Sequence, residues 1–254
     1  MIDPKPRIPG RGMWTRRGGL LPARPGVAGA LGYYRANVPG EPMIGLAGKN
    51  SMCSRDELAV HHGVRAIQRT LGNLVVDGLL GPQTGKAIYA LQRDHRVLVG
   101  PANGVLGPRT AIALWRPLVR EVARARGVPP WALGGLARHE SGMDPAAISV
   151  VNGVDTGLCQ INLSIHKFTV EQVCDPTFAL EWSAKNLREA YSRWEVHSLV
   201  DPWSIAIANH NSPVLATQWA NTGIEPFSIR RAKNKFPQIG EYVVSVRKGG
   251  AIFA

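Results

Sequence analysis

The sequence predicts a mainly α-helical protein, with a three-helix module and a second helical domain behind an irregular N-terminal arm. Residues 1–56 are rich in Pro, Gly and Arg and lack sustained periodicity. Residues 57–117 contain a repeated turn motif between helical patterns. From residue 118 to residue 254, apolar residues recur at the spacing of amphipathic helices. The chain therefore divides into an arm and two folded units.

The N-terminal arm is strongly basic. "KPRIPGRGMWTRRGG" and "ANVPGEPMIG" predict irregular chain, because Pro and Gly interrupt regular elements. Such a segment is either disordered or ordered only against a partner surface, and the sequence leaves both readings open.

An internal repeat marks residues 57–117. "DGLLGPQT" and "NGVLGPRT" both run Asp or Asn, Gly, an apolar pair, then Gly-Pro-x-Thr. Each copy predicts a tight turn with positive φ at its first Gly, a second turn at its second Gly, and a helix start near its Thr. The residues that define these turns are Asp77, Gly78, Gly81 and Thr84 in the first copy and Asn103, Gly104, Gly107 and Thr110 in the second.

Helical patterns flank these turns. "AVHHGVRAIQRTLG" predicts a helix that ends on Gly72, and "TGKAIYALQRDH" predicts a helix with Ile88 and Leu91 on one face. With the helix after the second turn, they form a compact three-helix module.

Four further helices are predicted after residue 117, in "RPLVREVARARG", "VPPWALGGLARHES", "FALEWSAKNLREAYSRW" and "DPWSIAIANHN". Pro130 suits the first turn of the second helix. One stripe of the third helix is apolar, which predicts burial against a core. The stripe consists of Leu180, Ala184, Leu187, Tyr191 and Trp194.

One acidic residue falls at the end of a predicted buried stripe. Glu140 follows Leu136 by four residues and Ala137 by three, so its carboxyl lies at the end of the buried face. Burial disfavours the ionised form of a carboxyl group, and such a group can deliver a proton near neutral pH. A partly exposed residue at a helix end is the alternative.

Composition excludes several classes of protein. No stretch approaches the roughly 20 apolar residues that span a bilayer. "TRRGGLLPARPGVAGALGYY" is the best candidate for an export signal, but Pro22, Arg24 and Pro25 interrupt it, so we expect no conventional signal peptide. There is no HExxH pattern and no phosphate-binding glycine loop, and we expect neither a metal nor a cofactor.

The three cysteines, Cys53, Cys159 and Cys174, are too few and too scattered for a disulfide framework or a zinc site. We expect buried, reduced thiols. A disulfide between the second and the third is the alternative.

The net charge of +12 implies an anionic partner, either nucleic acid, a membrane surface or the acidic polymers of a bacterial envelope. No recognition helix or RNA-binding pattern is present. We therefore expect no nucleic acid partner and no stable membrane insertion.

The repeat carries a first resemblance. The order helix, "DGLLGPQT", helix ending in "LQRDH", then "NGVLGPRT" resembles the peptidoglycan-binding module of many cell-wall hydrolases. The resemblance implies that residues 57–117 bind the cell wall and are not catalytic. A generic three-helix bundle is the alternative.

Four ordered blocks carry a second resemblance. "ESGMDPAAIS", "GVDTGLCQIN", "ANHNSP" and "IGEYVVSV" resemble the lysozyme-like lytic transglycosylases that cleave peptidoglycan. The resemblance implies a lysozyme-like (α+β) domain over 118–254, with Glu140 as the catalytic acid and base. The residues that it implies around the substrate are Ser141, Gly157, Leu158, Gln160, Ile161, Asn211 and Tyr242, the last close to Glu140.

Two residues depart from the family. Cys159 stands where Met is common, a tolerable apolar exchange, and His210 stands where the family has Tyr. We expect His210 to cap its helix, with sugar binding as the alternative. His139, next to Glu140, is expected on the surface.

The resemblance implies a mechanism with a single carboxyl group. Glu140 would protonate the oxygen between N-acetylmuramic acid and N-acetylglucosamine, and the substrate's acetamido group would stabilise the developing positive charge. The carboxylate would then take the proton of the muramoyl 6-hydroxyl, which closes a 1,6-anhydro ring.

Two alternatives compete. A hydrolytic lysozyme on the same fold needs a second carboxylate, for which Asp144 and Asp155 are candidates. Asp144 is expected in a turn before Pro145, and Asp155 in a Gly-rich loop. The other alternative is a catalytically inactive wall-binding protein of the virion, whereas no zinc ligands or nucleophile–base motif support a peptidase.

The module order, the basic arm and the lack of a clean export signal favour a bacteriophage enzyme. We expect a virion component, tail-associated, with residues 1–56 docked on tail or other virion proteins. The alternatives are a lysis endolysin, made in the host cytoplasm and released to the periplasm and cell wall, and a bacterial secretion-associated enzyme.

Overall fold

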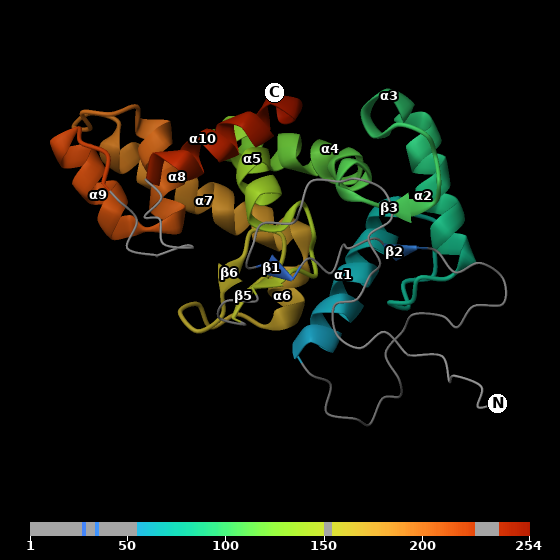
Figure 1. Ribbon diagram of the computed structural model, residues 1–254. Coiled ribbons are helices and arrows are strands. Elements are labelled where there is room, and N and C mark those ends of the chain that lie inside the picture. Colours follow the sequence, from blue (N-terminus) through green and yellow to red (C-terminus); the bar gives the residue numbers. More distant parts are fainter. Residues whose placement is uncertain (1–26, 29–33, 36–54, 150–153, 227–238) are drawn as a thin grey trace, which may run out of the picture.

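The computed structural model is built mainly from helices (Figure 1). It describes residues 27–28, 34–35, 55–149, 154–226 and 239–254. Most of the predicted arm, Cys53 included, therefore lies outside the described residues. The helices are α1 (Arg55–Leu71), α2 (Pro82–Asp94), α3 (Arg96–Val99), α4 (Pro108–Arg126), α5 (Pro130–Ser141), α6 (Val170–Cys174), α7 (Pro176–Trp194), α8 (Pro202–Asn211), α9 (Pro213–Thr222) and α10 (Ile239–Gly250), followed by the 3₁₀ turn η1 (Ala251–Phe253).

Short strands form two small antiparallel sheets. One has the order β1 (Val27–Ala28), β4 (Ile148–Ser149), β5 (Asp155–Thr156), β6 (Ile161–Asn162). The other pairs β2 (Tyr34–Arg35) with β3 (Val105–Leu106). Two pieces of the predicted arm thus pair with the two folded units of the same chain. The mainly helical prediction with a small strand element is confirmed.

The repeat is visible as two equivalent turns. Gly78 and Gly104 have φ of +80° and +71°, as predicted from their position in the motif. The helices that follow begin at Pro82 and Pro108, two residues before the predicted starts, because Gly81 and Gly107 are the N-caps and proline suits the first turn.

The first turn is held by a buried glutamine. Nε2 of Gln68 lies 2.8 Å from Oδ1 of Asp77 and 2.8 Å from the carbonyl of Leu79, and 3.3 Å from Oγ1 of Thr84. Its Oε1 accepts the N–H of Gly78 at 2.9 Å. One side chain on α1 therefore makes hydrogen bonds to residues at the start and at the end of the turn.

Gln92 on α2 does the same for the second turn. Its Nε2 lies 3.0 Å from Oδ1 of Asn103, 2.7 Å from the carbonyl of Val105 and 3.0 Å from Oγ1 of Thr110. Its Oε1 accepts the N–H groups of Asn103 and Gly104. The two copies of the motif therefore share a hydrogen-bond plan as well as a sequence.

The helix α4 belongs to both predicted domains. The boundary predicted between residues 117 and 118 falls inside it, at Pro117, and the helix continues to Arg126. Trp115 before the proline and Val119 after it are both fully buried. Buried residues from both halves of the chain form one continuous core, so the module is packed on the second domain and not joined to it by a linker.

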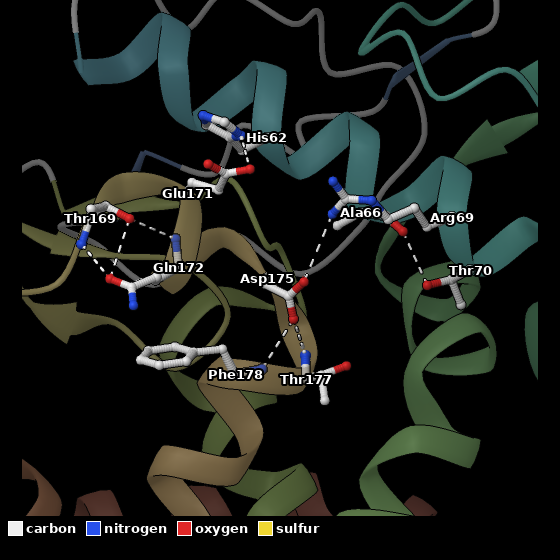
Figure 2. Close-up of polar contacts among 10 residues, drawn as sticks. All are labelled: His62, Ala66, Arg69, Thr70, Thr169, Glu171, Gln172, Asp175, Thr177 and Phe178. Atoms are coloured by element: carbon white, nitrogen blue, oxygen red, sulfur yellow. Dashed lines mark hydrogen bonds and ion pairs between the residues drawn. The ribbon is translucent and has the colours of Figure 1, made fainter.

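The helix α1 also contacts the second domain, along α6 and the start of α7 (Figure 2). One ion pair, Arg69 to Asp175 at 3.8 Å, crosses this contact, and Nδ1 of His62 lies 3.8 Å from Oε1 of Glu171. Gly63 approaches residue 146 so closely that a Cβ there would lie 2.7 Å from the Ala146 Cβ. The module thus supports the loop that follows α5.

Two glycines let α5 pack closely on the C-terminal segment. A Cβ at Gly135 would overlap the carbonyl oxygen of Val246 in α10, and one at Gly134 would overlap the ring of Phe253 in η1. Arg138 Nη1 donates to the carbonyl of Gly249 at 3.0 Å across the same contact. This close packing brings the last block of the sequence beside the end of α5, which carries Glu140.

Candidate functional site

Glu140 lies in the last turn of α5, with 6% of its surface exposed. The hydroxyl of Tyr242, on α10, donates a hydrogen bond to its Oε1. Gly142 ends α5 in the left-handed conformation, with φ of +71°. The carboxyl is thus buried and oriented from outside its own helix, rather than partly exposed at a helix end.

Ser141 ties α5 to the turn between β5 and β6. Its Oγ lies 2.8 Å from the carbonyl oxygen of Leu158 and 3.1 Å from that of Ala137, as a donor. It also accepts the N–H of Asp144 at 2.9 Å. The side chain of Ser141 therefore fixes the position of the β5–β6 turn relative to Glu140.

The β5–β6 turn has an unusual backbone. Gly157 has φ of +80°, and a Cβ there would overlap the carbonyl oxygen of Val173. Gln160 has φ of +50°, which is uncommon for a residue other than glycine. The N–H of Gly157 donates to the carbonyl of Ala147 at 2.8 Å, and Nε2 of Gln160 lies 3.1 Å from the same oxygen. The loop supported by α1 therefore holds this turn.

Gln160 has one polar atom that is not hydrogen-bonded within the described part of the chain. Its Nε2 is engaged by Ala147 and by the carbonyl of Gly157 at 3.0 Å, whereas its buried Oε1 finds no hydrogen-bond partner among the described residues. The side chains of Leu158 and Ile161 are fully buried in the hydrophobic core.

His210 does not cap its own helix, which corrects the expectation from sequence. It lies in the last turn of α8, and its Nε2 lies 3.2 Å from the carbonyl oxygen of Cys159 in the β5–β6 turn. The ring of Trp182 stands edge-on to the His210 ring, with 6.4 Å between the ring centroids. Asn211, the last residue of α8, is half-buried, and its side chain makes no hydrogen bond within the described ranges.

His139, expected on the surface, is only partly exposed. It is half-buried and stands edge-on to the ring of Tyr242, with 4.7 Å between ring centroids. Its Nδ1 lies 2.7 Å from Oγ of Ser245, one turn further along α10. The close approach of α5 and α10 covers this side of the helix, which the local pattern could not indicate.

The two candidates for a second carboxylate are both engaged in local structure. Asp144 is fully buried, and its Oδ1 accepts the N–H of Ala146 at 2.8 Å, as expected for a turn residue. Asp155 lies in β5 and not in a loop, and its Oδ1 accepts Nδ2 of Asn162 at 2.6 Å. Each carboxylate thus holds a backbone turn or a strand pair.

Cys159 and Cys174 are free and buried, as predicted, so the alternative disulfide is wrong. Burial raises the pKa of the Cys159 thiol to about 12 and raises that of Cys174 as well. A thiol in this state is not a nucleophile near neutral pH.

The glutamines that hold the repeat were missed at the sequence level. The signal was present, because "AIQR" at 66–69 and "ALQR" at 90–93 precede the two turns in the same order. Thr84 and Thr110 are buried against these glutamines and do not cap helices.

Neither a metal site nor a membrane span is found where the structure can be described. No three His, Cys, Asp or Glu side chains of the described ranges gather so that they could hold a metal ion. None of the described helices combines the length and the apolar character needed to cross a bilayer.

Comparison with known families identifies part of the chain. Residues 117–219 match the family model described as the transglycosylase SLT domain. The match begins inside α4 and ends inside α9, so it covers Glu140 and the β5–β6 turn but not Tyr242 or the repeat. It supports lytic transglycosylase activity on peptidoglycan for this domain. No curated protein matches the chain.

Proposed function

We propose that the protein cleaves the bond between N-acetylmuramic acid and N-acetylglucosamine in peptidoglycan by lytic transglycosylation, with Glu140 as the single acid and base. One observation carries the proposal: within the transglycosylase match, Glu140 is the buried carboxyl that receives a hydrogen bond from Tyr242. The β5–β6 turn, which Ser141 ties to α5, carries Gln160, whose buried Oε1 has no hydrogen-bond partner among the described residues.

Glu140 acts in two steps, first as a proton donor and then as a proton acceptor. Glu140 donates its proton to the glycosidic oxygen as the bond to the muramoyl C1 breaks, and N-acetylglucosamine leaves with a free hydroxyl. The acetamido oxygen of the substrate stabilises the positive charge at C1. The Glu140 carboxylate then takes the proton of the 6-hydroxyl as its oxygen bonds to C1. Tyr242 holds the carboxyl in place through both steps.

A reaction that needs only Glu140 allows Asp144 and Asp155 to serve structural roles. A lysozyme that uses water needs a second carboxylate as base or nucleophile. Both candidates are committed to local hydrogen bonds, to Ala146 and to Asn162. Closure of the 1,6-anhydro ring needs neither of them.

The test is mass spectrometry of purified peptidoglycan after digestion by the wild-type protein and by Glu140→Gln. We expect 1,6-anhydro-muropeptides from the wild type and a loss on the order of 10³-fold in the variant, the usual scale for removal of a general acid. Reducing-end products from the wild type would overturn the transglycosylase in favour of a lysozyme. No product from either protein, with wall binding retained, would leave a tethering role.

We also propose that residues 57–117 bind the wall. A binding module raises the local concentration of substrate at the catalytic site without new contacts there. Because α1 and α4 pack on the catalytic domain, a wall strand bound by the module would meet Glu140 in a fixed orientation. Retention of a Gln92→Ala variant on peptidoglycan in a sedimentation assay, equal to that of the wild type, would count against the module as the wall anchor.

We propose, finally, a tail-associated location in a phage virion with residues 1–56 as the docking arm. The support is the basic composition of this arm, whose residues 1–26, 29–33 and 36–54 lie outside the described ones. Western blotting of purified particles is the test, and absence of the protein from them would remove the proposal.

A further inference from the structure

A cavity of about 640 Å³ lies between α10 and the α8–α9 pair, separate from the Glu140 carboxyl. Its wall includes Trp219 of α9 and Val244 of α10, whose side chain is 47% exposed. Cavities of about 300–1,000 Å³ are the usual size of small-ligand sites. We call this cavity the α10 groove.

Charges of opposite sign line the two ends of the α10 groove. Glu241 and Glu225 lie at its start, where Oε1 of Glu225 accepts the N–H of Gly240 at 2.9 Å. Lys248 and Arg247 lie at its other end. Glu241 and Lys248 are seven residues apart, two turns of helix, so they share one side of α10 at a separation of about 10 Å.

The basic end is partly fixed in place. Arg247 forms an ion pair with Asp201, donates to Oγ of Ser204 at 3.0 Å and lies over the ring of Trp131 at 4.6 Å. Lys248 and Glu241, in contrast, take part in no ion pair within the described ranges. Among the described residues, the groove therefore offers one carboxylate and one ammonium group that form no ion pair, with apolar surface between them.

This arrangement fits an elongated zwitterion. An amine would lie against Glu241 and Glu225, a carboxylate about 10 Å away would lie against Lys248, and the chain between them would cover Val244 and Trp219. A short peptide with one side-chain amine and a free terminal carboxylate has these features, and the peptides that substitute peptidoglycan glycan are of this chemical class.

The α10 groove is also connected to the catalytic residues. Ser245, which lines it, contacts His139, and His139 packs on the ring of Tyr242. Tyr242 in turn donates to Glu140. A peptide attached to the sugar strand would thus be held by the same helix that orients the acid.

We propose that the α10 groove binds the peptide substituent of the glycan, which makes Glu241 and Lys248 specificity residues for substrate that carries peptide. This inference rests on the proposed transglycosylase function, which it deepens. It places peptide recognition on the α10 side of the molecule, outside the β5–β6 turn.

The first test is direct binding. A synthetic tetrapeptide with a lysyl side-chain amine and a free terminal carboxylate is titrated into the full chain and into Lys248→Glu, Glu241→Lys and Lys185→Glu. Lys185 is an exposed residue of α7, paired with Glu189, and gives the same change in charge away from the groove. We expect the two groove variants to bind at least tenfold more weakly and Lys185→Glu to bind as the wild type does. Equal weakening in all three variants, or in none, would overturn the proposal.

The second test separates the groove from the catalytic proposal. Rates of anhydro-product release are compared on intact peptidoglycan and on glycan freed of peptide by an amidase. We expect the wild type and Lys185→Glu to prefer the intact substrate about tenfold and the groove variants to bring this ratio close to one. A preference kept by Lys248→Glu and Glu241→Lys would overturn the groove as the peptide site. If the wild type releases no anhydro product at all, the proposed function fails, and the tetrapeptide titration still decides the groove.

Discussion

The hydroxyl of Tyr242 donates a hydrogen bond to Oε1 of Glu140, although 102 residues separate the two in the sequence. The contact depends on the close approach of α5 and α10, which Gly135 allows. This hydrogen bond orients the buried carboxyl of Glu140 in the protein without substrate.

Replacement of the tyrosine tests the contact itself. We expect Tyr242→Phe to lower kcat by about tenfold to a hundredfold, because a hydrogen bond to a charged group contributes about 1.5–3 kcal/mol. KM is expected to change little, since the ring still fills its place against His139. Release of anhydro-muropeptides measures the rate, and near-wild-type Tm controls for folding. An unchanged kcat would show that Glu140 needs no orientation by this hydroxyl.

The glycine contact between α5 and α10 gives a matched pair of variants. Gly135→Ala places a methyl group on the carbonyl of Val246, and we expect it to lower the free energy of unfolding by about 1–3 kcal/mol and to reduce activity, as α10 is displaced. Gly249→Ala meets its nearest atom, Cδ of Arg138, at 3.5 Å, an ordinary contact. This control is expected to be neutral or stabilised by up to about 1 kcal/mol. Urea denaturation measures both, and equal stability of the two variants would contradict the close approach.

In the structure, a single glutamine supports each turn of the repeat. Gln92→Ala leaves the N–H groups of Asn103 and Gly104 without their acceptor, and we expect a loss of about 1–3 kcal/mol in urea denaturation. Gln83, exposed on α2, provides the control, and Gln83→Ala is expected within about 0.5 kcal/mol of the wild type. A similar small effect at both positions would show that the turn holds without Gln92.

Because the pKa of His62 is lowered in the folded protein, we expect the protein to lose stability on acidification. Its side chain is 17% exposed at the contact between α1 and α6, and burial lowers its pKa from the ordinary value of 6.5, although Glu171 opposes this shift. Between the lowered pKa and 6.5 the unfolded chain binds more protons at this residue than the folded one, so the free energy of unfolding falls as the pH falls through this range. We expect the Tm of His62→Gln to depend less on pH than that of the wild type between pH 7.5 and 5.5. A steeper dependence in the variant would mean that the ion pair with Glu171 outweighs burial.

Much of the fold could be predicted because its signals are local. Proline at the first turn and glycine at the end mark α5, and the apolar stripe of α7 indicates its buried face. Positive φ at Gly78 and Gly104 follows from the motif, since few other residues adopt this conformation without strain. The boundary between the domains is less clear from sequence, because α4 continues through Pro117 without a break in packing.

By itself, the sequence determined the helices α1, α2, α4, α5, α7 and α8, the two repeat turns and the carboxyl that ends a buried stripe, because these depend on residues within a few positions of one another. It did not indicate α3, α6, α9 or α10 as helices. The tertiary structure decided what each polar side chain meets. The pairing of Tyr242 with Glu140, the packing of His139 on that tyrosine and the contact of His210 with Cys159 each join elements distant in the chain. They follow from how closely helices approach, which depends on the packing of the whole core rather than on local pattern.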